Sequence, residues 1–280
     1  MENPVPKHVK VEAKHYAEYL RQQREIAESL KYASYIQQAL FPPLALIERL
    51  LPDHFIFYQP RELVSGDFYY VSGYNGYVFV AVGDCTGHGV PGAFMSLLGI
   101  TFLNEIISRR NYTNAASILN QMREYVMQAL CQTGEESEQK DGIDLTLCVL
   151  DTSKNRLDFA GAFNPLYIIR NQQLTEIIGD NMPVGIGAEE ERPFTNHVFD
   201  LHDQDILYLF SDGYVDQFGG PFGKKFKYNP FRELLLSGSH LSMPDQKQRI
   251  IQTFDSWKGN LRQLDDVLVC GFRYRDSSTP

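Results

Sequence analysis

Aspartates recur in one setting along this chain of 280 residues, at the edges of apolar strand-like runs and beside small residues. They are Asp67 in SGDFYYV, Asp84 at the end of YVFVAVGD, Asp212 at the end of DILYLFSD, and Asp265 and Asp266 just before VLVCGF. A carboxylate at the end of a buried strand is held rigidly, and a neighbouring glycine lets a ligand or another backbone segment approach closely. A single aspartate in this position more often caps a turn, but the repetition indicates an acidic site.

If these strand ends converge, several carboxylates share a small volume. Like charges at that range raise one another's pKa values unless a cation compensates them. Mg²⁺ or Mn²⁺ suits carboxylate and water ligands, and two such ions about 4 Å apart can activate a water and hold phosphate oxygens during in-line attack. The residues therefore predict an acidic metal site, whose convergence the sequence alone does not show.

A long helix precedes the acidic segments. Residues 8–41 contain neither glycine nor proline, and Pro42-Pro43 then stops the helix. Steps of four and three along it give a seam with five apolar members out of seven, as in a short, imperfect coiled coil: Tyr19, Gln23, Ile26, Leu30, Ala33, Gln37 and Leu40. We expect residues 1–43 to form a dimerising helix or signal linker in front of a domain at 44–280. The alternative is an amphipathic helix that lies on its own domain.

From residue 54 onward, short aromatic and β-branched runs separated by glycine and asparagine predict antiparallel strands. The strand-like runs number about ten, and helical patterns lie between them at 91–110, 113–132, 229–237 and 244–258. Helices inserted between antiparallel pairs indicate an α+β domain with helices packed outside the sheets.

Composition excludes several classes of protein. The net charge is −9 and no long basic run occurs, so nucleic acid is not an expected partner. Four cysteines without CxxC spacing indicate neither a zinc site nor a disulfide framework, and Cys148 and Cys270 lie in apolar runs as expected for buried thiols. No apolar run approaches about 20 residues and the N-terminus lacks a secretory segment, which predicts a cytoplasmic protein without membrane insertion.

Several motifs together resemble the SpoIIE-like, sigma-factor-regulator branch of the metal-dependent, PP2C-type serine/threonine phosphatases. They are GDCTGHGVPGAFMS at 83–96, FSDGYVDQ at 210–217 and LDDVLV at 264–269, supported by SGDFYYV, DLTLCVLD, FAGAFNPLYIIR, MPVGI and YIQQALFPP, in the family's order over about residues 30–275. The resemblance implies a four-layer α-β-β-α sandwich of two antiparallel sheets with outer helices. It also implies hydrolysis of phosphoserine or phosphothreonine by a metal-bound water, on a signalling partner of the anti-anti-sigma type.

The resemblance also implies a ligand set for two ions, Mn²⁺ or Mg²⁺. Asp84 matches the aspartate that bridges both ions, and Cys85 would offer its main-chain carbonyl. Asp212 matches the aspartate on the first ion, while Asp265 matches the C-terminal ligand with Asp266 as the adjacent alternate. Asp67 matches an acidic residue beside the centre.

Some positions depart from the wider family. Thr86 stands where that family has a histidine that is a candidate general acid. His88, two residues later, could protonate the leaving serine oxygen or could simply serve the turn. Leu268 stands where relatives often have Thr or Ser after the final acidic pair. The first strand of the domain has no obvious phosphate-binding arginine, and Arg61 is the nearest candidate.

Three further features have both a plain and a functional interpretation. Asp144 could be an outer acid of the metal site or a solvated strand start, and Asn164-Pro165 forms a turn that could face the substrate groove. The loop at 219–231 carries Lys224, Lys225 and Lys227, which could recognise phosphate or an acidic partner, or could be solvated while Phe222 and Phe226 pack inward.

The primary hypothesis is thus a protein phosphatase with Asp84, Asp212 and His88 as its catalytic residues. Two alternatives stay open: a phosphatase-like scaffold that binds partners without turnover, and a two-metal nuclease or phosphodiesterase. The retained aspartates argue against the scaffold, and the lack of a basic run argues against the nuclease.

Overall fold

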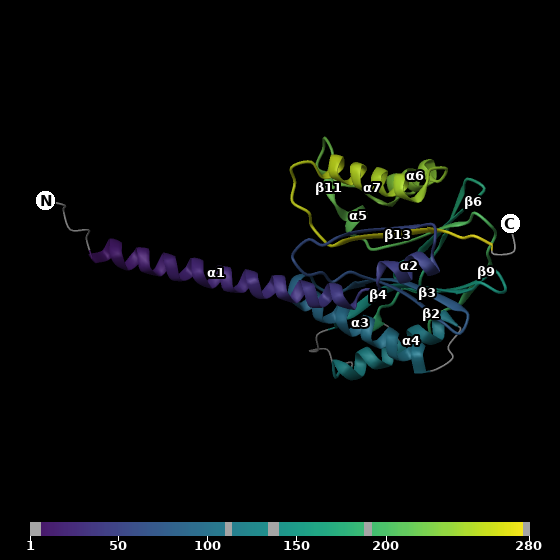
Figure 1. Ribbon diagram of the computed structural model, residues 1–280, viewed down its shortest axis with the longest axis horizontal. Helices are drawn as coiled ribbons and strands as arrows, with labels where there is room; N and C mark the ends of the chain where they lie inside the picture. Colours follow the sequence, from purple (N-terminus) through teal and green to yellow (C-terminus); the bar gives the residue numbers. More distant parts are fainter. Residues whose placement is uncertain (1–6, 110–113, 134–139, 188–191, 277–280) are drawn as a thin grey trace.

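Two antiparallel sheets face each other in the computed structural model, which describes residues 7–109, 114–133, 140–187 and 192–276 (Figure 1). The first sheet has the strand order β1 (His54–Gln59), β13 (Val267–Arg273), β10 (Ile206–Phe210), β6 (Leu166–Arg170), β7 (Gln173–Ile177). The second has the order β2 (Phe68–Tyr74), β3 (Tyr77–Cys85), β4 (Gly142–Asp151), β5 (Arg156–Ala162), β9 (His197–Asp200), with β8 (Val184–Gly185) paired to β4.

Helices cover the outer face of each sheet (Figure 1). The second sheet packs against α3 (Gly89–Arg109) and α4 (Ala115–Ala129), and the first against α5 (Gly213–Asp216), α6 (Tyr228–Gly238) and α7 (Met243–Lys258). The predicted four-layer α-β-β-α fold is confirmed. The strands β11 (Phe218–Gly219) and β12 (Lys224–Lys225) form a separate hairpin next to α5.

Between the sheets lies an apolar core to which both contribute. Val80 and Leu157 of the second sheet pack there with Leu209 and Leu268 of the first. Because helices cover the other faces, β3 and β10 are buried on both sides and their sequences read as nearly unbroken apolar runs. This burial fixes the strand ends where Asp84 and Asp212 stand.

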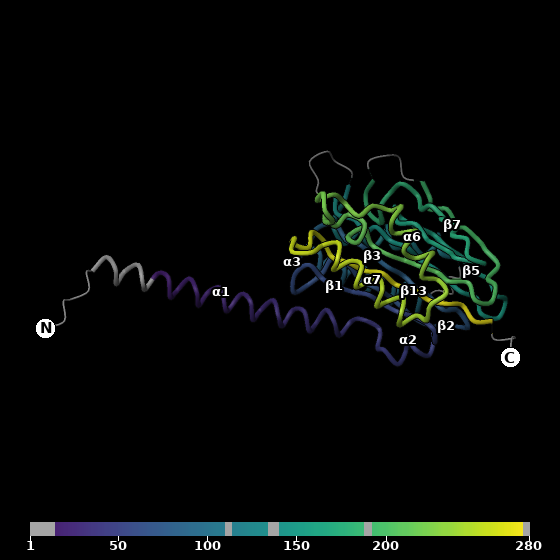
Figure 2. Tube along the Cα trace, turned by 90° about the horizontal axis from the view of Figure 1, so that it is seen from above, coloured from purple at the N-terminus to yellow at the C-terminus, as the bar shows by residue number. Residues whose placement is uncertain are grey.

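The N-terminal helix α1 (Lys7–Leu40) projects away from the sandwich (Figures 1 and 2). Among residues 15–40, whose side chains the structure describes, the buried ones are Ser34 and Gln37 in the last turns, where the helix docks on the domain. Of the predicted seam, Tyr19, Ile26 and Leu40 are exposed, whereas Gln37 is 3% exposed and therefore belongs to the domain side. The alternative of a helix lying on its own domain applies only to these last turns, and the division at residue 43 stays a prediction.

The predicted helices are present, and α3 begins two residues earlier than predicted. Its Pro91 stands in the first turn, where a missing N–H costs no hydrogen bond. Among the helices of the described ranges, α3 alone is long and apolar enough to span a membrane by composition. It packs on the second sheet with Leu103 and Ile107 buried, as a core helix does.

Short helices such as α2 (Leu44–Leu50) were not predicted from the sequence. The helix α2 follows Pro43 and buries Ile47 against the inter-sheet core. Residues 134–139 of the polar loop expected at 134–142 lie outside the described residues.

Candidate metal centre

Asp84 and Asp144 stand side by side on neighbouring strands. They are paired Cα positions of β3 and β4 at the same end of the second sheet. Burial raises the pKa of Asp84 well above its usual value, and the charges of Asp67, Asp212 and Asp144 raise it further. Burial also raises the pKa of Asp144 to about 7, with a further contribution from Asp212. Asp212 thus lies near enough to the Asp84–Asp144 pair to raise the pKa of both carboxyls, which supports the predicted convergence, while their role as metal ligands stays a prediction.

Asp67 connects the two sheets from a buried position just before β2. Its carboxylate accepts a hydrogen bond of 2.5 Å from Ser211 Oγ, which in turn accepts one from Leu268 N–H at 3.1 Å. Burial raises the pKa of Asp67 well above its usual value, the Ser211 bond opposes the shift, and the charges of nearby aspartates add to it. The side chain thus lies among the other acids while being held from the opposite sheet.

Asp212 lies two residues after β10 and directly before α5. A Cβ atom added at Gly213 would lie 1.8 Å from the main-chain oxygen of Asp266, so only glycine permits this approach of the two segments. Burial raises the pKa of Asp212 to about 6, and Asp216 and Asp265 add to the shift. Lys225 opposes it from the β11–β12 hairpin, where its Nζ lies 2.6 Å from Asp216 Oδ2.

The adjacent Asp265 and Asp266 have different surroundings. Asp266 is buried, and its two carboxylate oxygens accept the main-chain N–H groups of Arg61 at 2.7 Å and Gly66 at 2.8 Å. Asp265 is exposed, and within the part of the chain that the structure describes its carboxylate accepts only the N–H of Asp266. Of the two, Asp265 has an oxygen available to a cation, while Asp266 anchors the loop between β1 and β2.

The main chain at Cys85 packs against the loop between β1 and β2, which Asp266 anchors. A Cβ added at Gly66 would be 2.7 Å from the carbonyl oxygen of Gly87 and 3.2 Å from that of Cys85, so the loop before Asp67 packs directly on this segment. The Cys85 side chain is buried, and the ligand role expected for its main-chain carbonyl stays a prediction. Thr86 exchanges hydrogen bonds with Gly142 and so extends the pairing of β3 and β4.

His88 stands on the rim. Its side chain is 50% exposed, and its Nδ1 lies 3.1 Å from Glu62 Oε1. Partial burial of its carboxyl raises the pKa of Asp265, although the residue as a whole is exposed, and the proximity of Arg61 and His88 opposes this rise. Within the described ranges, Arg61 Nε is buried without a hydrogen-bond partner.

The donor set fits a divalent cation. Within the described ranges, no ion pair joins a Lys, Arg or His side chain to Asp67, Asp84, Asp144 or Asp212, so no direct salt bridge compensates their mutual repulsion. In those ranges, no three His, Cys, Asp or Glu side chains by themselves form a preformed cage. A set of spaced carboxylates with a main-chain carbonyl suits Mg²⁺ or Mn²⁺, which keep several waters.

The loop at 219–231 is partly as expected. Phe226 packs inward against Tyr214, whereas Phe222 is exposed instead of packing inward. Lys224 and Lys225 form β12, and the pair between Lys225 and Asp216 places this hairpin beside the acidic centre.

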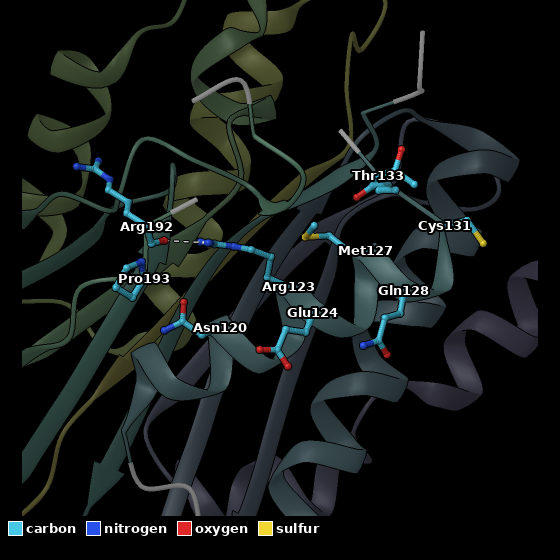
Figure 3. Close-up of a pocket in the computed structure, with 10 residues that line it drawn as sticks. Asn120, Arg123, Glu124, Met127, Gln128, Cys131, Thr133, Arg192 and Pro193 are labelled. Carbon is cyan, nitrogen blue, oxygen red and sulfur yellow. Dashed lines mark hydrogen bonds between the residues drawn. The ribbon is translucent and has the colours of Figure 1, made fainter. Parts of the chain in front are cut away.

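A hollow of about 600 Å³ lies elsewhere, between α4 and Arg192-Pro193 (Figure 3). Arg123 crosses it and donates from Nη1 to Arg192 O at 2.8 Å. None of the aspartates of the acidic centre lines this hollow.

Sequence reasoning missed three side chains that position the centre. Ser211 stands between the last residue of β10 and Asp212, and could have been suspected as a small polar residue directly after the apolar run ILYLF. Gln37 interrupts the apolar seam of α1; it donates to Ser65 O at 2.6 Å and to Ser96 Oγ at 2.8 Å. Glu62, the partner of His88, has no distinguishing signal in the sequence.

Comparisons with known proteins agree with this geometry. Residues 74–275 match the family described as Stage II sporulation protein E (SpoIIE). The solved structure of the SiaA-PP2C domain of Pseudomonas aeruginosa is 30% identical, over 90% of this chain and 98% of that chain, with a TM-score of 0.82. Among curated protein sequences, no relative matches the chain.

Two more distant structures share the fold. The PP2C phosphatase domain with a regulatory fragment of SpoIIE from Bacillus subtilis is 18% identical, over 79% of this chain and 63% of that chain, with a TM-score of 0.62. The RsbU and RsbW domains of a Mycobacterium tuberculosis protein are 20% identical, over 81% and 61% of the chains, with a TM-score of 0.63.

Proposed function

Because this chain belongs to the SpoIIE family of PP2C-type, metal-dependent serine/threonine phosphatases, we propose that it removes phosphate from serine or threonine of a cytoplasmic regulatory protein of the anti-anti-sigma type. The family, the fold and the enzyme class predicted from the sequence are confirmed by these matches. Dependence on Mg²⁺ or Mn²⁺ follows from the family. The particular partner and the use of two ions are part of the proposal.

The observation that supports the proposal most is the shared electrostatic environment of Asp84 and Asp212. Asp212 raises the pKa of Asp84 and of Asp144, its partner on the neighbouring strand, although Asp212 and Asp84 are far apart in the sequence. Asp84, Asp212, Asp265 and the Cys85 carbonyl would hold the cations, while Asp67 and Asp266 position the segments that carry them. When bound, the cations supply a nucleophilic water and neutralise phosphoryl oxygens.

His88 has a separate role in the proposal. It stands on the rim with Nδ1 against the Glu62 carboxylate, and this contact orients the imidazole. A proton held there can pass to the serine or threonine oxygen as the phosphate departs. The weaker alternative is that the pair with Glu62 only fixes the loop before α3.

The N-terminal helix provides a route for regulation. Exposed apolar side chains along its projecting part, including Tyr19 and Ile26, favour pairing with a second copy of the helix. At its other end Gln37 bonds Ser65, and the Oγ of Ser65 accepts the N–H of Asp67. A change in the helix could therefore reach the acidic centre through one loop.

Sedimentation and activity measurements test this route. Ile26→Asp should convert a dimer to a monomer, whereas Arg24→Ala, on the same exposed stretch, should not. Gln37→Ala should lower Mn²⁺ affinity. Monomeric wild-type protein would contradict the dimer, and unchanged Mn²⁺ affinity would contradict the coupling.

Hydrolysis of p-nitrophenyl phosphate and of a phosphothreonine peptide with Mn²⁺ tests the function. Asp84→Asn and Asp212→Asn should each lower both rates by at least about 10³-fold. Asp200→Asn is the matched control, because Asp200 pairs with Arg156 at the opposite end of β5 from the acidic centre. If the wild-type protein hydrolyses neither substrate in the presence of metal, the result favours the scaffold. If it cleaves only phosphodiesters, the result favours the nuclease or phosphodiesterase.

A further inference from the structure

The turn between β5 and β6 has a strained backbone. Phe163 has φ +55°, a region that bulky side chains rarely adopt. The N–H of Asn164 donates to the carbonyl of Ala162 at 2.6 Å, which closes a three-residue turn around Phe163. Turns of this size with positive φ at the centre are rare because they are strained.

The surrounding chain holds this turn in place. The N–H of Phe163 donates to Asp180 O at 2.8 Å, and the N–H of Asp180 donates to Gly161 O at 2.8 Å. A Cβ at Gly161 or at Gly179 would lie 2.5 Å or 2.8 Å from the Asn164 carbonyl oxygen, so both positions must be glycine for the turn to pack. Strain that the neighbourhood maintains in this way is typical of functional positions.

Strand register places the turn at the acidic centre. Leu145 of β4, the neighbour of Asp144, pairs with Ala162, the last residue of β5, and Phe163 follows directly. Two residues after Asn164 the chain enters β6 of the other sheet. The turn therefore joins the two sheets at the end of β5 that lies next to the Asp144 end of β4.

The two residues of the turn differ in exposure. Phe163 is 42% exposed, although an aromatic ring of this size is usually buried. Asn164 is 7% exposed, and its Nδ2 has no hydrogen-bond partner within the described ranges. A rigid turn thus keeps an apolar ring in solvent at the edge of a charged site.

Other exposed apolar side chains are next in sequence to residues of the rim or the centre. They are Leu63 beside Glu62, Val90 beside Gly89, and Leu264 beside Asp265. Several segments that carry the acidic groups or the rim therefore also present exposed apolar side chains. Isolated exposed apolar residues are ordinary, but several of them on the segments of a charged centre indicate a docking surface.

We infer that Phe163 contacts the protein substrate and selects phosphorylated segments with an apolar side chain next to the phosphorylated residue. The inference rests on the proposed phosphatase function, because the phosphate must sit over the acids that the ring borders. An apolar neighbour of the phosphorylated residue then lies against the ring and removes its surface from water. The ring must stay exposed in the free enzyme for this contact, which accounts for a backbone that keeps it there.

Two synthetic phosphothreonine peptides of equal charge and length test the inference. One carries Leu and the other Ser on both sides of the phosphothreonine, and kcat/KM is measured for each with Mn²⁺. Wild-type protein should prefer the Leu peptide by about 10-fold, the lower end of the range for an added apolar contact. Phe163→Ser should reduce this ratio to about 1, and Phe163→Leu should restore much of it.

The ratio of two peptides in one sample does not depend on how much of a variant is folded. Tyr74→Ser is the matched control, because Tyr74 is an exposed aromatic residue at the far end of β2, and it should keep the wild-type ratio. Equal kcat/KM for both peptides with wild-type protein, or a preference that survives Phe163→Ser, would overturn the inference while leaving the phosphatase function intact. Failure of wild-type protein to hydrolyse p-nitrophenyl phosphate and both peptides would overturn the proposed function and the inference with it.

Discussion

Ser211 donates a 2.5 Å hydrogen bond to the buried carboxylate of Asp67 and thereby joins the end of β10 in one sheet to the start of β2 in the other. The same hydroxyl accepts the N–H of Leu268, so it satisfies a buried donor as well. One small side chain therefore fixes the position of an acid of the centre relative to the strands of the opposite sheet.

Ser211→Ala should destabilise the chain by about 1–3 kcal/mol, because it leaves the Leu268 N–H and the Asp67 carboxylate without this partner. It should also weaken Mn²⁺ binding, since the pKa of Asp67 rises further without the Ser211 bond. Thermal melting and Mn²⁺ titration measure the two effects. Ser108→Ala, which removes only a bond within α3, is the control, and equal behaviour of the two variants would refute the role of Ser211.

Asp265→Asn and Asp266→Asn should have opposite signatures. Loss of the Asp265 charge should lower Mn²⁺ affinity by about 10-fold or more with little change in Tm. Asp266→Asn should lower Tm instead, because an amide cannot accept both the Arg61 and Gly66 N–H groups, at a cost of about 1–3 kcal/mol. Calorimetric titration measures the Mn²⁺ affinity of both variants, and melting curves measure their Tm. If Asp266→Asn lowers the affinity and Asp265→Asn lowers the Tm, Asp266 is the ligand instead.

His88→Gln should lower kcat far more for a phosphoserine peptide than for p-nitrophenyl phosphate. A serine alkoxide needs a proton to leave, whereas p-nitrophenolate does not, and general acid catalysis contributes about 10²-fold or more. Glu62→Gln, which removes the carboxylate at Nδ1, should give a smaller loss of the same kind. Equal losses on both substrates would assign His88 to the structure of the loop.

Without divalent cations, the chain should become less stable as pH rises from about 5 to 8. Burial holds the pKa of Asp212 at about 6 and that of Asp144 at about 7, above their ordinary value of 3.8. The folded chain therefore binds more protons than the unfolded chain in this range, and ionisation opposes folding. Tm in EDTA should fall by about 5 °C or more over this range.

Asp144→Asn should flatten this dependence, and added Mn²⁺ should raise Tm most at pH 8, where the acids are ionised. Melting curves of the same samples at each pH supply the comparison. A Tm in EDTA that rises towards pH 8 would contradict the raised pKa values.

The sequence predicted the parts of the centre that depend on strand pattern. Asp84 and Asp212 end apolar runs that are buried on both faces, so their rigid placement was readable from the residues alone. The proximity of Asp84 and Asp212 in space was not readable from the residues, because it depends on how the two sheets face each other. The family resemblance supplied the sandwich, and the structure confirms it.

Other features depend on contacts that leave no local pattern. Asp265 and Asp266 are neighbours of the same type, yet only the fold decides that Asp266 turns inward to the Arg61 and Gly66 amides. The strain at Phe163 arises from packing around Gly161 and is not encoded by residue type. The helix α2 has seven residues, which is too few for a helical period to stand out.

Anomalous scattering from Mn²⁺-soaked crystals tests the central claim most directly. We expect two strong peaks near the carboxylates of Asp84 and Asp212, with Asp265 and the Cys85 carbonyl beside them, and loss of both peaks in Asp84→Asn crystals. Peaks only at other sites, or Asp84 and Asp212 bound to separate ions far apart, would contradict a shared metal centre.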